Sequence, residues 1–169
     1  MGHAAGYFPR DGGARVNRRG ETISGVARVI RRGETISGVV VHVLDGDTIR
    51  IRTDSGDVVV QLNGVDAPDR GWKYGVESKA FVKEICMGVA VRVGVLGYDR
   101  YGRTVGNVRL PDGRDLANEI IRAGCGWWYV EYARGDVEKR SLMLEARAAG
   151  VGLWGFPPCV PPWKACRSH

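Results

Sequence analysis

The stretch that decides the fold is residues 39–70, which read VVVHVLDGDTIRIRTDSGDVVVQLNGVDAPDR. Runs of β-branched residues alternate with short turns that contain Asp and Gly, a pattern typical of β-hairpins. Two of the turns are acidic, at residues 45–48 (DGDT) and residues 66–69 (DAPD). Hairpin-linked strands can bring such ends together, and carboxylates brought together repel one another unless a cation lies between them. The stretch therefore predicts a small β-barrel that carries a site for a hard cation with oxygen ligands.

The composition is that of an ordinary globular domain with a basic balance. The 169 residues are 44% hydrophobic and 26% charged, and Lys plus Arg outnumber Asp plus Glu by 25 to 19, which gives a net charge of +6. A positive charge attracts a polyanion, and an acidic cluster can hold a cation where that polyanion reacts. Taken alone, however, the charge is explained by solubility.

Several classes of protein and site are excluded by the sequence pattern. No apolar run is long enough to span a membrane, and no Cys is spaced with His as in a zinc finger. Cys159 and Cys166 flank a Pro-rich turn and would form a disulfide in an exported protein or remain free thiols in a cytoplasm. The N-terminus lacks the apolar core of a signal peptide, so we expect a cytoplasmic protein, or a secreted or periplasmic one if a signal peptide has been removed.

An exact repeat lies near the N-terminus, where residues 18–26 (RRGETISGV) recur letter for letter as residues 31–39. Only the second copy runs into the Val-rich strand, so we expect it to begin the first strand and residues 1–34 to form a flexible arm. The first copy could compete for that strand, add an edge strand or pair with a second molecule. A duplication without function is the simpler interpretation. We therefore expect a monomer, with a strand-swapped dimer as the alternative.

The periodicity predicts a folded domain over residues 35–155, followed by a Pro-rich tail at residues 156–169. The first helix is predicted to bury Val76, Ala80, Phe81 and Ile85, and the third to bury Val137, Leu144 and Ala148. The predicted strands are residues 36–44, 48–53, 58–65, 89–96 and 104–110, and the predicted helices are residues 75–87, 115–123 and 136–149. Five short strands with a helix between the third and fourth predict an α+β fold, mostly β: a five-stranded OB-fold barrel with three helices.

Four motifs in order give the chain a family resemblance. DGDT at residues 45–48, VDAP at residues 65–68, DRYGR at residues 99–103 and GLW at residues 152–154 resemble the staphylococcal nuclease (thermonuclease) family. Each motif alone is weak, but all four in this order on the predicted elements are specific. The resemblance covers about residues 36–155 and implies an OB-fold that cleaves DNA and RNA with one calcium ion, with single strands preferred.

The resemblance also implies roles for the acidic residues. Asp47 and Asp66 resemble the two carboxylate ligands of the calcium. Ala67 stands where the family supplies a main-chain carbonyl ligand, a role that does not depend on the side chain. Asp45 resembles the carboxylate that lies behind the metal.

A second set of residues resembles the family's phosphate and nucleotide contacts. Arg103 matches the arginine that contacts the reacting phosphate, and Arg100 and Tyr101 resemble neighbours that hold an adjacent phosphate. Tyr129 or Tyr132 corresponds to a tyrosine of the nucleotide pocket, and the spacing leaves both open. Cations and guanidinium groups stabilise the charge that builds on phosphorus in the transition state, which is why the chemistry needs them.

Two positions depart from the family pattern. Gln61 stands where the family usually has Arg, and losing a charged donor of this kind typically costs ~10²-fold to ~10³-fold in rate. Asp69 stands where the family usually has the Glu that acts as general base or orients the water, and a displacement of ~1 Å at such a group can cost ~10²-fold. Arg70, the next residue, could replace the missing guanidinium.

Three functions are therefore consistent with the sequence. The first is a calcium-dependent nuclease, slowed by Gln61 and Asp69. The second is a non-catalytic OB module that binds nucleic acid and keeps the cation site. The third is a structural domain with an empty acidic corner, which would not explain why Tyr101 and Arg103 accompany that corner.

Overall fold

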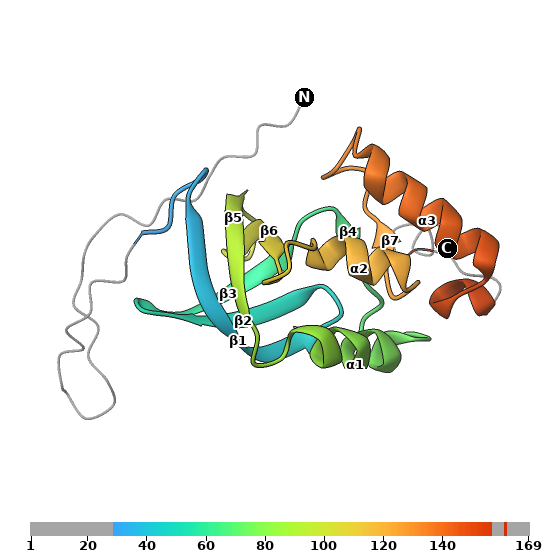
Figure 1. Ribbon diagram of the computed structural model, residues 1–169, viewed down its shortest axis with the longest axis horizontal. Helices are drawn as coiled ribbons and strands as arrows, with labels where there is room; N and C mark the ends of the chain where they lie inside the picture. Colours follow the sequence, from blue (N-terminus) through green and yellow to red (C-terminus); the bar gives the residue numbers. More distant parts are fainter. Residues whose placement is uncertain (1–28, 157–160, 162–169) are drawn as a thin grey trace.

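The computed structural model of the protein describes residues 29–156 and residue 161. Within this part, five strands close into a barrel in the order β1-β2-β3-β6-β5 (Figure 1). Their bounds are β1 Thr35–Asp45, β2 Thr48–Thr53, β3 Gly56–Leu62, β5 Ala90–Tyr98 and β6 Thr104–Arg109. All neighbouring strands are antiparallel except β3 and β6, which are parallel. The predicted five-stranded OB-fold is confirmed.

The alternation of side chains along β2 explains why this segment forms a barrel wall. Ile49 and Ile51 are fully buried, whereas Arg50 and Arg52 are exposed. A hairpin turn was predicted at residues 54–57, but only residues 54–55 form it, and Gly56 already begins β3 with a φ of 118°, in the left-handed region that only Gly adopts at little cost. The turn pairs Thr53 with Gly56 and so fixes the register of β2 and β3 as far as Thr48 and Gln61.

The predicted third strand, residues 58–65, began two residues late and ran past the observed end of β3. The strand ends at Leu62, and a separate two-residue strand, β4 Val65–Asp66, follows Gly64, whose φ is 74°. β4 leaves the barrel and pairs with β7 Trp127–Trp128 in a small sheet of its own. The break moves Asp66 out of the barrel wall and places it beside the chain that follows the second helix.

Three helices surround the barrel in the described residues: α1 Gly75–Cys86, α2 Leu116–Arg122 and α3 Val137–Ala149. α1 packs against β1, whereas α3 packs on α2 and lies on the opposite side of the molecule from β1 and β5 (Figure 1). A 3-10 turn, η1 Gly152–Gly155, follows α3. No helix formed by the described residues combines the length and apolar character needed to cross a bilayer.

The face that α3 buries was predicted wrongly, and the face of α1 was predicted correctly only in part, since Phe81 and Ile85 pack against the core and Val76 and Ala80 do not. In α1 the buried line is Ser78, Val82 and Cys86, and Val76 is exposed. In α3 the buried residues are Lys139, Leu142 and Ala146, whereas the predicted Val137 and Leu144 are exposed. In both helices the buried face includes a polar side chain that has a hydrogen-bonding partner inside the protein. Ser78 Oγ donates to Cys125 O at 2.5 Å, and Lys139 Nζ donates to Asn118 Oδ1 in the first turn of α2.

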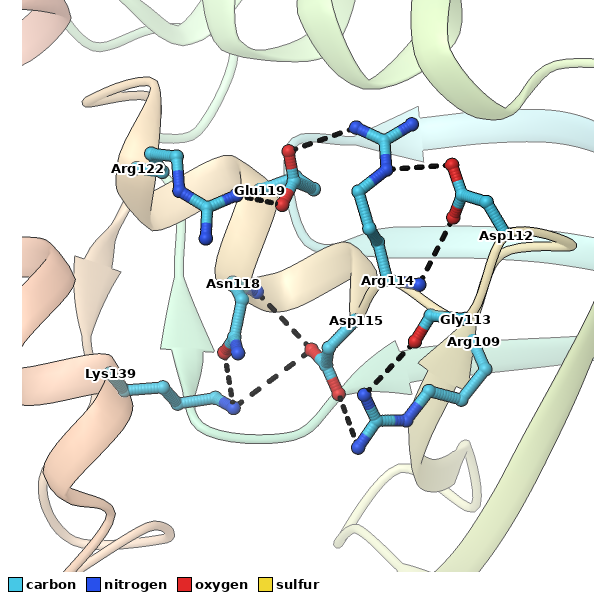
Figure 2. Close-up of polar contacts among 9 residues, drawn as sticks. All are labelled: Arg109, Asp112, Gly113, Arg114, Asp115, Asn118, Glu119, Arg122 and Lys139. Atoms are coloured by element: carbon cyan, nitrogen blue, oxygen red, sulfur yellow. Dashed lines mark hydrogen bonds and ion pairs between the residues drawn. The ribbon is translucent and has the colours of Figure 1, made fainter.

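Lys139 joins α3 to α2 through a buried polar network (Figure 2). Its Nζ donates to Asn118 Oδ1 at 2.8 Å and lies 3.1 Å from Asp136 Oδ2 and 3.9 Å from Asp115 Oδ1. Burying an ammonium group is costly unless it is paired in this way. The stem of Lys139 also packs against Gly64, where an added Cβ would lie 3.0 Å from Lys139 Cε. The network thus supports the chain immediately before Asp66.

Part of the sequence-based interpretation concerns residues that the structure does not describe, namely residues 1–28, 157–160 and 162–169. The first copy of the repeat and most of the predicted arm lie there, as do Cys159, Cys166 and most of the tail. Residues 35–39 of the second copy form the start of β1. Cys86 and Cys125 are buried free thiols, and burial raises their pKa to about 12 and about 11, respectively, so both stay protonated at neutral pH.

Candidate functional site

The first acidic turn is pressed against α1 and the second acidic turn. It connects β1 to β2 and carries Asp45 and Asp47. Gly46 lies at the closest approach, because a Cβ there would overlap Ser78 Oγ and lie 2.6 Å from Ala67 Cβ. Only Gly fits at that point, and its absence of a side chain lets Asp47 lie against the main chain that follows Asp66.

Asp47 is buried, at 8% exposure, and both of its carboxylate oxygens accept hydrogen bonds. Oδ2 accepts from the main-chain N–H of Ala67 at 3.0 Å, and Oδ1 accepts from Thr48 Oγ1 at 2.9 Å. The same Thr48 hydroxyl lies 2.9 Å from Gln61 Oε1. Gln61 is therefore coupled to Asp47 through one intervening side chain, as the pairing of Thr48 with Gln61 across β2 and β3 requires.

The electrostatics of the corner are dominated by burial and by neighbouring carboxylates. Burial raises the pKa of Asp47 to about 8; the charge of Asp45 and a hydrogen bond with it add to the shift, the Ala67 N–H opposes it, and the charge of Asp66 adds a little more. Burial likewise raises the pKa of Asp66 to about 6, with a further contribution from the charge of Asp69. Each charged group that shifts either pKa is itself a carboxylate. The structure therefore brings Asp45, Asp47, Asp66 and Asp69 together, as the sequence predicted for the two acidic turns.

The donor set of this corner fits a hard cation. Carboxylates crowded into a partly buried place repel one another, and a divalent cation removes that repulsion. A carboxylate offers about four lone pairs, so Asp47 can accept from Ala67 N–H and Thr48 and still bind a cation. No group of three or more His, Cys, Asp or Glu side chains among residues 29–156 is arranged to hold a metal by itself. The predicted set, Asp47, Asp66 and the carbonyl of Ala67, has only two side-chain ligands, so water or substrate oxygens must complete it.

Asp69 and Arg70 lie on the exposed loop after the second acidic turn. The main-chain carbonyl of Asp69 accepts from the N–H of Trp72 at 2.9 Å. Gly75, the first residue of α1, is packed so closely on this carbonyl that a Cβ would overlap it. The main chain at Asp69 is thus fixed while its side chain faces solvent near Asp66, whose pKa it influences.

Arg103 belongs to a second cluster, organised by Asp99. Asp99 Oδ1 accepts from the N–H groups of Tyr101, at 2.8 Å, and Arg103, at 2.9 Å, and Arg103 Nε lies 2.5 Å from Asp99 Oδ2. Burial works to raise the pKa of Asp99, but these hydrogen bonds outweigh it and hold the pKa below its usual value. The guanidinium groups of Arg100 and Arg103 lie 4.8 and 5.4 Å from the Tyr101 ring centroid. The structure therefore brings the three predicted phosphate-binding residues together.

The two clusters lie on the outer face of the barrel but do not touch. Arg103 lines a hollow of about 570 Å³ that includes neither Asp47 nor Asp66. The parallel register pairs Val60 with Thr104, which places Arg103 one residue before and Gln61 one residue after that pair. At ~3.3 Å per residue and ~4.8 Å between strands, the Cα atoms of Arg103 and Gln61 are about 8 Å apart. A long Arg side chain released from Asp99 can therefore approach Gln61.

The aromatic run at residues 127–132 divides into packing residues and surface residues. Trp127 is buried, and Trp128 Nε1 donates to Ala133 O at 3.2 Å. Tyr129 and Tyr132 instead pack ring to ring at the surface, with centroids 4.9 Å apart. Because β7 pairs Trp127 with Asp66, Tyr129 emerges beside the acid corner. Burial first, then its hydrogen bond to Glu131, raises the pKa of Tyr129 to about 12, so the phenol stays protonated.

Sequence reasoning gave no role to several residues that shape the site. Asp99 was only a letter of the DRYGR motif, although an Asp followed by Gly three residues later is a usual signal for a side-chain-stabilised turn. Ser78 and Glu131 carried no signal, because their partners are Cys125 O and Tyr129 in distant or irregular segments.

Comparison with known proteins places the chain in a family. The profile described as Staphylococcal nuclease homologue matches residues 59–155. An "Uncharacterized endonuclease" of Escherichia coli O157:H7 is 40% identical over 116 residues, which are 69% of this chain and 75% of the relative. A "Micrococcal nuclease" of Shigella flexneri is 32% identical over 126 residues, 69% of this chain and 72% of the relative. The "Probable staphylococcal-like nuclease CAN1" of Oryza sativa subsp. japonica is 31% identical over 105 residues, 62% of this chain and 31% of the relative.

The closed OB barrel and the two polar clusters on its outer face define a small nucleic-acid enzyme fold of the thermonuclease type. The protein belongs to the staphylococcal nuclease homologue family.

Proposed function

We propose that the protein is a calcium-dependent nuclease that hydrolyses phosphodiester bonds of DNA and RNA with little sequence preference. The observation that carries the proposal is the acid corner, in which the buried Asp47 lies beside Asp45 and Asp66 and, within the described part of the chain, no cationic side chain shifts the pKa of Asp47 or Asp66. Family membership and relatives named as nucleases support the same assignment.

The residues that would hold the calcium are Asp47, Asp66 and the carbonyl of Ala67, with Asp45 behind them. A divalent cation there supplies positive charge that stabilises the charge developing on a reacting phosphate. The hydrogen bonds from Ala67 N–H and Thr48 keep the Asp47 carboxylate in one orientation, so little reorganisation is needed when the ion binds.

Three other residues act on the substrate. Asp69, on the fixed loop beside Asp66, orients the attacking water or accepts its proton. Arg103 moves from Asp99 to the phosphate, where its planar fork meets two oxygens. Gln61 can donate a hydrogen bond to the phosphate but brings no charge, and we expect this to limit the rate.

The surface tyrosines favour single-stranded substrates. Tyr132 is 66% exposed and packs against Tyr129 beside Asp66. Exposed aromatic rings next to a phosphate site can stack on unpaired bases, and each such contact is typically worth ~1–3 kcal/mol. Paired bases already stack on one another and would have to open first.

A non-catalytic nucleic-acid-binding module is the second candidate. It is favoured by the neutral Gln61 and by the ion pair that holds Arg103 on Asp99 rather than at the acid corner. A structural domain without ligands is not favoured, because it leaves the crowded carboxylates unexplained.

A cleavage assay decides between the two candidates. Single-stranded DNA and RNA are incubated with the protein in calcium or in chelator, and the products are separated on a denaturing gel. The nuclease assignment predicts calcium-dependent cleavage that disappears in Asp47→Asn, which keeps the shape of the side chain and removes its charge. Binding of the same strands without cleavage in either lane would establish the second candidate instead.

A further inference from the structure

A pair of arginines faces solvent on the barrel wall away from the acid corner. Arg92 of β5 and Arg109 of β6 lie directly opposite each other in register. Both are exposed, because the neighbouring Val91, Val93 and Val108 fill the barrel interior. Like charges that face each other across two strands repel, so a pair of guanidinium groups in this position is stabilised by an anion between them.

The surroundings neutralise this pair only in part. Arg109 Nη1 donates to the carbonyl of Gly113 at 3.3 Å, and Nη2 lies 4.0 Å from Asp115 Oδ2 (Figure 2). Asp115 is shared with the buried Lys139, 3.9 Å away. The side chain of Arg92 has neither a hydrogen-bonded nor an ion-pair partner among the residues that the structure describes. One guanidinium is thus held in place by the chain, and the other is available.

A shallow groove of about 460 Å³ runs beside the two arginines. Its lining includes the small residues Ser37, Gly38 and Ala90 and the apolar residues Val39, Leu110 and Pro111. Its charged lining residues are Arg52, Arg92, Arg109 and Asp54, and Arg52 is paired with Asp57 at 2.9 Å. An open groove with the exposed Arg92 and Arg109 along one side matches the charge of a sugar–phosphate strand.

We propose that this groove binds the phosphodiester backbone of a single-stranded nucleic acid, several nucleotides away from the bond at the acid corner. This proposal rests on the proposed function in one respect, which is that the ligand is a nucleic acid. The outer face of β2 connects the two places, because the exposed Arg50 and Arg52 follow the buried Thr48 along the strand from the acid corner toward the groove.

The distance sets the length of strand that can reach both places. Ser37 pairs with Arg92, and the register of β1 with β2 places Ser37 level with Asp54, seven residues along β2 from Asp47. With ~3.3 Å per residue and ~4.8 Å between strands, Arg92 lies about 25 Å from Asp47 along the surface. A stacked strand covers this with about seven nucleotides, at ~3.4 Å each. Shorter strands should bind at one place only.

The test is binding of fluorescent single-stranded DNA, measured by anisotropy in chelator over a series of salt concentrations. For a strand of twenty nucleotides, Arg92→Gln should reduce the slope of log affinity against log salt by ~0.7, and Arg92→Gln with Arg109→Gln by ~1.4. A strand of three nucleotides cleaved in calcium should show the parent rate in these variants. Arg140→Gln is the matched control, because Arg140 is an exposed residue of α3 and its loss changes the net charge equally.

Each outcome is decisive for the groove. Reduced slopes for the Arg92 and Arg109 variants, with no change in Arg140→Gln, support it. Equal reductions of the salt slope in all variants, Arg140→Gln included, would mean that only net charge matters and would overturn the proposal. Unchanged slopes would also overturn it, and so would a parent protein that does not bind the strand of twenty nucleotides. Binding in chelator does not depend on cleavage, so an inactive protein that binds through Arg92 refutes the nuclease and not the groove.

Discussion

Replacing Gln61 by Arg restores the charge that the family resemblance led us to expect at this position. Gln61 lies half-buried on β3, opposite Thr48, and reaches Asp47 through the Thr48 hydroxyl. An Arg side chain there loses the hydrogen bond with Thr48 but brings a guanidinium group to the acid corner. No cationic side chain of the described residues shifts the pKa of Asp47 or Asp66 in the parent protein.

The magnitude follows from the distances. Two contacts of 2.9 Å separate the Gln61 amide from the Asp47 carboxylate, so the new charge lies within about 6 Å of the corner. At that distance, and with an effective dielectric constant of ~20, two unit charges interact by about 3 kcal/mol. If that interaction is made with the transition state and not with the bound substrate, the rate rises by about 10²-fold.

The assay is steady-state cleavage of a single-stranded DNA that carries a fluorophore and a quencher, in calcium. We expect kcat of Gln61→Arg to rise by about 10²-fold with little change in KM, because the charge acts on the transition state. Gln61→Met is the control that removes the amide without adding charge, and it should not be faster than the parent. A folded Gln61→Arg variant with the parent's kcat, or a lower one, would refute the reasoning and direct attention to Arg70.

Three further predictions concern single residues. Asp69→Glu should raise kcat by up to ~10²-fold, because it lengthens the side chain toward the water, and the same cleavage assay measures it. Lys139→Met should lower the free energy of unfolding by about 3 kcal/mol in urea titrations, because it leaves the buried Asn118 and Asp115 without the Lys139 ammonium group, whereas Arg140→Met at the exposed neighbouring position should change it by less than ~0.5 kcal/mol. Asp136→Asn should cost about 1 kcal/mol at pH 7, since Lys139 and the N–H groups of α3 hold the pKa of Asp136 below its usual value despite the opposing effect of burial. A carboxyl group whose pKa is lower in the folded state stabilises the fold at pH values above its unfolded pKa, and this stabilisation is lost as the pH falls through the folded pKa. The free energies of unfolding of parent and variant should therefore converge below pH ~4, and a difference that stays constant with pH would contradict this.

The barrel was predictable from sequence because its signals are local. The alternation of Ile49, Arg50, Ile51 and Arg52 defines both faces of β2, and the turn at residues 54–55 sets its register with β3. The predicted turn at residues 54–57, however, would place Thr48 opposite Asn63. The observed two-residue turn places Thr48 opposite Gln61 instead, and this pairing opens the hydrogen-bonded path to Asp47.

The parts that were missed depend on tertiary contacts. The face of α3 is chosen by the buried pairing of Lys139 with α2, which no apolar periodicity reveals. β7 has two residues, too few to show a period, and it exists because β4 turns away at Gly64. The position of Arg103 is set by Asp99, four residues earlier in an irregular loop. Where a residue is positioned by a partner outside regular structure, the sequence indicated which residue belongs to the site but not where its side chain lies.

The central claim is that Asp47 and Asp66 hold a doubly charged cation, and calorimetric titration tests it most directly. Calcium is titrated into the protein, with a short single strand that resists cleavage present, up to millimolar concentration. The account predicts saturable heat in the parent that is lost in Asp47→Asn and in Asp66→Asn, while both variants remain folded. No heat in the parent, or undiminished heat in both variants, would contradict it.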